Sequence, residues 1–97
     1  MSYKLLFLPS ALKEWKKLPE GVRAQFKEPL RRRLESPHVP ASRVRGYKNH
    51  YKIKLRSAGY RLVYEATEET IAVCVICVGR RDTIYKTLHK RKAKEKK

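Results

Sequence analysis

The sequence predicts a single domain of the α+β class, in which a helical hairpin packs on one face of a mainly antiparallel sheet. Three observations lead to this prediction. A short apolar stretch opens the chain, two amphipathic helical stretches follow it, and three stretches rich in β-branched and aromatic residues come after a proline-containing loop. The chain has 97 residues, enough for one domain with one modest core.

The first half of the chain contains the expected first strand and the helical hairpin. Residues 3–8 are aromatic and apolar and stop at a proline, as a short strand does. Ser10 can cap a helix over residues 11–18, whose apolar side chains fall on one stripe. A second helix is expected over residues 22–36, and Pro29 within it should kink the helix or split it into two pieces.

The second half contains the rest of the sheet. Residues 37–50 are expected to form a loop, because they hold two prolines, a glycine and several basic residues. Three strands then follow, over residues 51–56, 60–66 and 70–78. Residues 83–90 predict a last short helix. Residues 91–97 are too charged to pack, so we expect a domain of residues 1–90 followed by a basic, flexible tail.

The charge of the chain is its most unusual property. Twenty-five Lys and Arg residues face only nine Asp and Glu, which gives a formal net charge of +16. Such an excess attracts polyanions, so the expected partner is nucleic acid rather than an acidic protein or a membrane. No apolar run is long enough to span a bilayer, and the N-terminus lacks the pattern of a signal peptide. We therefore expect a cytoplasmic protein.

The hairpin formed by the first two of these three strands concentrates positive charge. If its turn contains an even number of residues, the apolar positions align on one face and Lys54 lies directly opposite Arg61 on the other. Lys52 lies on that same face, about 6.6 Å from Lys54 along the strand. Like charges opposed across a sheet are destabilising, so this arrangement suggests a site for an anion. Two alternatives are a solvated lysine face and a three-residue turn with a bulge at Gly59, which would rotate Arg61 away.

The stretch Gly79-Arg80-Arg81 follows the last expected strand. Gly79 is expected to end that strand, so an arginine there projects from a rigid element toward a phosphate. Tyr85, one helical turn later, can point back to the same place. The simpler interpretation of these residues is an exposed basic pair and a tyrosine that packs in the core.

Other chemistries find little support in the sequence. The three histidines, His38, His50 and His89, are scattered over different elements, so we interpret them as incidental. No carboxylate cluster of the kind that holds a catalytic metal is expected beside the cations, so we expect neither a metal nor another cofactor. Cys74 and Cys77 lie within an expected buried strand. Residues three apart on a strand point to opposite sides, so we interpret them as two inert thiols rather than a metal or redox pair.

Several segments, in order along the chain, resemble the RelE family of bacterial type II toxin–antitoxin toxins. They are Ala11-Leu-Lys-Glu-Trp-Lys-Lys-Leu18, Leu34-Glu-Ser-Pro37, Val44-Arg-Gly46, Tyr51-Lys-Ile-Lys-Leu-Arg-Ser57, Gly59-Tyr-Arg-Leu-Val-Tyr64 and Val78-Gly-Arg-Arg81. The resemblance covers about nine-tenths of the chain, and the two hairpin segments are its most specific part. It implies the RelE/ParE-like fold and an endoribonuclease that cuts messenger RNA in the ribosomal A site.

The resemblance also implies roles for individual residues. The catalytic set is Lys52, Lys54, Arg61, Arg81 and Tyr85. In a metal-independent attack by the RNA 2′-hydroxyl, which leaves a 2′,3′-cyclic phosphate, Arg61 and Lys54 would hold the phosphate and Lys52 would accept the proton. Arg81 would serve the leaving oxygen and Tyr85 would stack on the nucleotide, although the sequence leaves open which residue is base and which is acid. Further contacts to RNA or the ribosome are expected from Arg43, Arg45, Lys48, Arg56, Arg80, Lys86, Lys90 and Arg91.

The implied partners are the ribosome with its 16S rRNA, messenger RNA and a cognate RelB-like antitoxin. Operator DNA would be bound only through the toxin–antitoxin complex, which would regulate its own operon. Two rival interpretations remain at this point. One is a noncatalytic toxin of the same fold that poisons gyrase, and the other is a basic module that only binds RNA or the ribosome.

Overall fold

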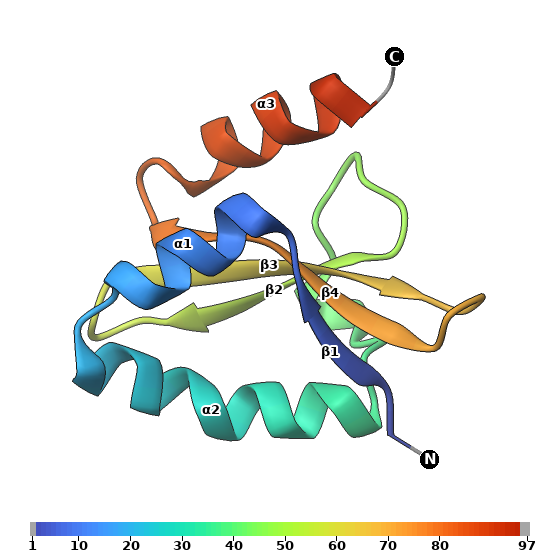
Figure 1. Cartoon of the computed structure of the whole chain (residues 1–97), viewed down its shortest axis with the longest axis horizontal. Coiled ribbons are helices and arrows are strands. Elements are labelled where there is room, and N and C mark those ends of the chain that lie inside the picture. The colour runs from blue at the N-terminus through green and yellow to red at the C-terminus, as the bar shows by residue number, and fades with distance from the viewer. Residues whose placement is uncertain (1, 96–97) are drawn as a thin grey trace.

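The computed structural model describes residues 2–95, and it confirms the α+β class (Figure 1). Its elements in chain order are β1 (Lys4–Phe7), α1 (Pro9–Lys17), α2 (Glu20–Glu35), the short 3-10 helix η1 (Pro40–Ser42), β2 (His50–Leu55), β3 (Tyr60–Thr67), β4 (Ala72–Arg80) and α3 (Ile84–Glu95). No helix among these residues is both long and apolar enough to cross a membrane.

The sheet has four strands in the order β1-β4-β3-β2. β1 runs parallel to β4, and the other two pairs are antiparallel. Helices α1 and α2 pack with the sheet in the larger core cluster, around the fully buried Phe26 and Tyr64. Helix α3 covers the other face, where Ile84 and Leu88 pack against Val63 in a second cluster. Figure 1 shows α3 and α2 on opposite sides of the sheet.

The hairpin of helices differs from the prediction at two points. Helix α1 begins at Pro9, and the side chain of Ser10 makes no capping bond; proline suits this first position because its fixed φ is helical and it needs no donor. Helix α2 is not divided at Pro29. The carbonyl of Gln25, which Pro29 leaves without an N–H donor, lies on an exposed turn, where water can satisfy it, while buried Phe26 and Leu30 hold the helix on the sheet.

A β-bulge changes which way the middle of β4 faces. Val63 pairs with Cys77 but the next residue, Tyr64, pairs with Val75, so Ile76 is an extra residue in β4. As a result Cys74, Ile76 and Cys77 all pack against the cluster under α3. The prediction that the two sulfurs face opposite sides is therefore wrong, because it assumed an unbroken strand. Burial raises the pKa of the Cys77 thiol to about 12, so this thiol stays protonated at neutral pH.

Helix α3 is longer than predicted. It continues through residues 91–95, where the sequence suggests a loose tail; residues 96–97 of that tail lie outside the described part of the chain. Arg91 donates to both carboxylate oxygens of Glu14 on α1, at 2.9 and 2.6 Å, and to the carbonyl of Ile76 at 2.8 Å. The same carboxylate accepts the backbone N–H of Val78 at 3.1 Å. We call these contacts the Glu14–Arg91 junction; they join α1, the bulge of β4 and α3.

Candidate active site

The cations of the β2–β3 hairpin lie where the alternation pattern predicts them. Lys54 is paired with Arg61, and Lys52 with Val63, so the predicted register is confirmed. The turn is made possible by Gly59, which has a φ of +72° and donates its N–H to the carbonyl of Leu55 at 2.8 Å. The bulge at Gly59 that would have rotated Arg61 away does not occur, and the cations lie on the face that carries α3.

Arg61 is in contact with Tyr85. Its guanidinium donates to the Tyr85 hydroxyl at 3.1 Å and lies 5.6 Å from the centre of the ring. Tyr85 reaches this position because Ile84 and Leu88, on the same helix, are fully buried and fix the helical face that Tyr85 occupies. Tyr85 itself remains 36% exposed, so its ring is accessible beside the arginine. It is therefore not the buried packing residue of the simpler interpretation.

Two pockets meet at Arg61. The small pocket has a volume of about 240 Å³ and is lined by Lys54, Leu55, Arg56, Gly59, Tyr60, Arg61 and Arg81. The large pocket has a volume of about 530 Å³ and is lined by Val44, Arg45, Tyr47, Lys52, Arg61, Tyr85, Leu88 and His89. The other four predicted catalytic residues thus line one or other of the pockets that share Arg61, and the linings of both pockets contain no carboxylate.

The crowding of positive charge has an electrostatic consequence at Lys54. Its neighbours Lys52 and Arg61, with smaller contributions from desolvation and Arg56, lower the pKa of Lys54 below its ordinary value. Lys54 is the residue affected because it stands between Lys52 on its own strand and Arg61 on the next.

Arg80 and Arg81 lie in different environments. β4 does not end at Gly79 but continues through Arg80, which pairs with Tyr60 and lies 5.5 Å from the centre of its ring. Arg81 is the first residue after the strand; its backbone N–H donates to the carbonyl of Gly59 at 2.9 Å, which fixes it beside the hairpin turn. Of the two arginines, it is Arg81 that lines the small pocket.

Most of the predicted outer contacts are exposed, but one is not available. The exposed residues are Arg43, Arg45, Lys48 and Arg56 around the loop and hairpin, Arg80 at the end of β4, and Lys86 and Lys90 on α3. Arg91, also predicted to contact RNA, differs from these exposed residues. Its guanidinium is occupied by the Glu14–Arg91 junction, where the hydrogen bond to Glu14 raises the pKa of Arg91.

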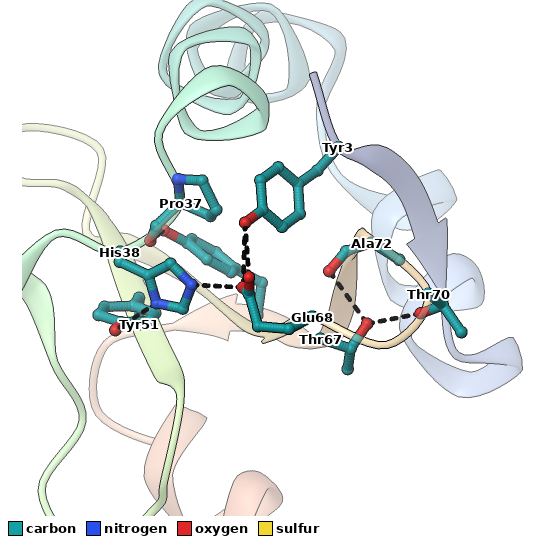
Figure 2. Close-up of polar contacts among 9 residues, drawn as sticks. Tyr3, Pro37, His38, Tyr51, Thr67, Glu68, Thr70 and Ala72 are labelled. Atoms are coloured by element: carbon teal, nitrogen blue, oxygen red, sulfur yellow. Dashed lines mark hydrogen bonds and ion pairs between the residues drawn. The ribbon is translucent and has the colours of Figure 1, made fainter. Parts of the chain in front are cut away.

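The histidines take part in two separate sets of contacts. His38 lies in a polar network at the far end of the sheet, where its ring nitrogens contact Glu68 at 2.6 Å and the Tyr51 hydroxyl at 2.9 Å (Figure 2). The Tyr3 hydroxyl donates to the same carboxylate. This network ties the residue before β1, the strand β2 and the loop after α2 to the β3–β4 turn. Within residues 2–95 no group of three or more His, Cys, Asp or Glu side chains is arranged to hold a metal ion.

His89 belongs instead to the large pocket, where sequence reasoning missed it. It lies 3.3 Å from the Tyr47 hydroxyl, and both residues line the pocket beside Tyr85. A tyrosine between basic residues of a loop, Arg45 and Lys48, was the available signal. Its partner on α3 could not be foreseen, because the two residues are 42 positions apart.

Comparison with known proteins places this fold and site in a family. The model of the family described as "ParE toxin of type II toxin-antitoxin system, parDE" matches residues 5–85. The mRNA interferase toxin RelE of Escherichia coli K12 is 52% identical over 82 residues, which make up 84% of this chain and 86% of that protein.

Solved structures agree with this. A mutant of the E. coli toxin RelE in the free state has a TM-score of 0.85 and 48% identity, over 94% of this chain and 98% of that one. The toxin in the intact E. coli RelBE toxin–antitoxin complex has a TM-score of 0.80 and 52% identity, over 81% of this chain and 96% of that one. These matches define the class as toxins of type II toxin–antitoxin systems. Within this class, the chain belongs to the RelE family.

Proposed function

We propose that this chain is an endoribonuclease toxin that cuts messenger RNA in the ribosomal A site without a metal. The observation that carries the proposal is the pairing of Lys54 with Arg61, with Arg81 and Tyr85 beside them, around pockets whose linings contain no acid. Repulsion among these cations destabilises this face of the sheet, and a bound phosphate would offset the repulsion. The name of the E. coli relative, an mRNA interferase, supports the same activity.

The proposed chemistry is an attack within the RNA. The 2′-oxygen forms a bond to the adjacent phosphorus, the bond from phosphorus to the 5′-oxygen breaks, and the products are a 2′,3′-cyclic phosphate and a 5′-hydroxyl. One proton leaves the 2′-hydroxyl and one arrives at the 5′-oxygen. Fixed cations aimed at the charge that develops on the phosphate are the main source of rate acceleration.

Individual residues then take the following roles. Arg61 and Arg81 bind the phosphate oxygens from either side of the small pocket, and Arg81 is also placed to serve the leaving oxygen. We assign the proton acceptor to Lys54 in place of Lys52, the residue first considered, because the neighbouring cations lower the pKa of Lys54. Tyr85 holds the nucleotide against the guanidinium of Arg61.

The proposal extends to the partners. The structures of RelBE complexes support a RelB-like antitoxin for this chain, and the exposed cations around the site support contact with messenger RNA and 16S rRNA. Operator DNA would be bound by the complex through the antitoxin. We propose that the toxin acts in the cytoplasm, where its substrate is.

The test is primer extension on messenger RNA bound to purified ribosomes. Arg61→Ala and Arg81→Ala should each slow single-turnover cleavage by about a hundredfold or more, the scale of one lost transition-state contact. Lys27→Ala, which removes an exposed cation of α2 outside both pockets, is the matched control and should cut at the wild-type rate. Wild-type rates for both arginine variants would show that the site is misassigned.

One observation favours a second function. The matching family model is described by the ParE toxin and not by an RNA-cutting toxin. The second function is the noncatalytic, gyrase-poisoning toxin of the same fold. The cluster of Lys52, Lys54, Arg61 and Arg81 argues against this alternative, because binding alone does not require cations opposed across a sheet. Growth arrest with intact messenger RNA on ribosomes would favour it.

A further inference from the structure

The large pocket differs in character from the small one. The small pocket is lined mainly by cations and suits a phosphate, whereas the large pocket has an apolar floor made by Val44 and Leu88, which are 6% and 0% exposed. Tyr47 and Tyr85 add aromatic surface to it. Proteins hold single-stranded bases on such aromatic and apolar surfaces, and they read the base edges with polar atoms.

Arg61 connects the two pockets, because its side chain lines both. A phosphate bound by Arg61 in the small pocket would therefore leave its attached nucleoside at the mouth of the large pocket. The volume of about 530 Å³ falls within the usual range for small-ligand sites, so one base fits there with room for its sugar.

Tyr47 and His89 both line this large pocket. Their side chains meet at 3.3 Å, across the gap between the loop before β2 and helix α3. The Tyr47 ring is also packed against His50, with ring centres 5.6 Å apart, so it is half-buried and held in place. The hydroxyl and the imidazole are both able to donate and accept hydrogen bonds, which is what recognition of a base edge requires.

We propose that the large pocket is a nucleobase site, in which Tyr47 stacks on or borders the base and Tyr47 with His89 selects which base is accepted. The proposal rests on the proposed function, because it assigns the nucleotide that adjoins the bound phosphate. Tyr47 and His89 are specificity residues here, distinct from the cations that act on the phosphorus.

Binding to the isolated chain tests the pocket without any cleavage. Titration with inorganic phosphate and with each of the four nucleoside 3′-monophosphates, followed by NMR or calorimetry, should show at least one nucleotide bound about tenfold or more tightly than phosphate, the scale of one stacked base. Tyr47→Ala should bring that ratio close to one and leave phosphate affinity unchanged. Arg61→Ala should weaken phosphate and nucleotide together. Equal affinities for phosphate and all four nucleotides would overturn the proposal.

Cleavage mapping on ribosomes supplies the second arm. The wild-type chain should cut a set of messages with varied A-site codons unequally, and Tyr47→Ala and His89→Ala should flatten this preference by about tenfold. Tyr47→Phe keeps the ring and should retain the stacking part of the preference. If both alanine variants cut with the same codon profile as the wild type, the base pocket would be refuted while the nuclease assignment would stand. A chain that binds nucleotides but never cuts would refute only the nuclease.

Discussion

The lowered pKa of Lys54 predicts an effect on stability as well as on chemistry. A lysine whose pKa is lower in the folded than in the unfolded chain destabilises the fold whenever it is protonated. This destabilisation is complete at pH values below the folded pKa, and it disappears as the pH rises through the unfolded value near 10.5. The repulsion among Lys52, Lys54 and Arg61 is therefore a cost that the free toxin carries at neutral pH.

Lys54→Met should accordingly raise the melting temperature at pH 7 in low salt. The gain should shrink as salt is added, because screening weakens the repulsion in the wild type, and it should vanish as the pH approaches 11. Thermal unfolding across pH and ionic strength measures this. Lys27→Met, at an exposed position of α2, is the control and should show no such gain. A Lys54→Met chain that is no more stable than the wild type at low salt would mean that the cations do not strain the fold.

Helix α3 carries Tyr85, and the Glu14–Arg91 junction fixes the C-terminal part of this helix. Arg91 donates three hydrogen bonds, two to the carboxylate of Glu14 and one to the carbonyl of Ile76 in the bulge, and its side chain is only 20% exposed. The junction also satisfies the N–H of Val78, next to the bulge. Loss of Arg91 would leave the Glu14 carboxylate partly buried without its cation.

Arg91→Ala should cost about 1–2 kcal/mol of unfolding free energy, the lower part of the range for charge-assisted bonds because the pair is partly exposed. Hydrogen exchange should accelerate across α3 before it does in β3, and cleavage should slow because Tyr85 is no longer held on Arg61. Arg91→Lys keeps the charge but not the two-pronged geometry, so it should fall between wild type and Arg91→Ala. Unchanged exchange in α3 would show that Ile84 and Leu88 hold the helix alone.

The elements differ in how far they could be predicted. The β2–β3 register follows from the period-two pattern and from Gly59, which are both local, and for this reason the pairing of Lys54 with Arg61 was predicted correctly. The bulge at Ile76 could not be predicted from the local sequence, because a continuous run of apolar residues has the same pattern with or without a bulge. The expectation that Cys74 and Cys77 face opposite sides of the sheet was wrong for that reason.

Contacts between distant segments account for the remaining errors. Arg91 is 77 positions from Glu14, and a basic residue near a charged terminus looks exposed until its acid is known. The contact between Tyr47 and His89 could not be predicted for the same reason, because the two residues lie far apart in the sequence. Lys52, Lys54 and Arg61 were therefore predictable from one hairpin, whereas the contact between Tyr47 and His89 depends on where α3 lies.

At the scale of the whole molecule, the net charge of +16 and the two separately covered sheet faces determine how a partner can bind. The positive charge attracts any acidic protein and speeds encounter, but charge alone gives a complex that salt dissolves. Lasting affinity needs apolar burial. The cluster under α3 is a small one, built on Ile84, Leu88, Val63 and the buried part of β4. A partner segment that competes with α3 for this face would gain that apolar surface and also remove Tyr85 from Arg61.

We therefore predict that the cognate antitoxin binds at nanomolar concentration or tighter and that the complex survives about 0.5 M salt, because screening at that strength removes steering but not buried contacts. Co-expression with the neighbouring open reading frame, pull-down at low and high salt, and rescue of growth measure this. Hydrogen exchange of the complex should show changed protection in α3, whereas α2, on the opposite face, serves as the internal reference. A complex that separates at 0.5 M salt, or a neighbour that neither binds nor restores growth, would contradict the toxin–antitoxin assignment of this partner.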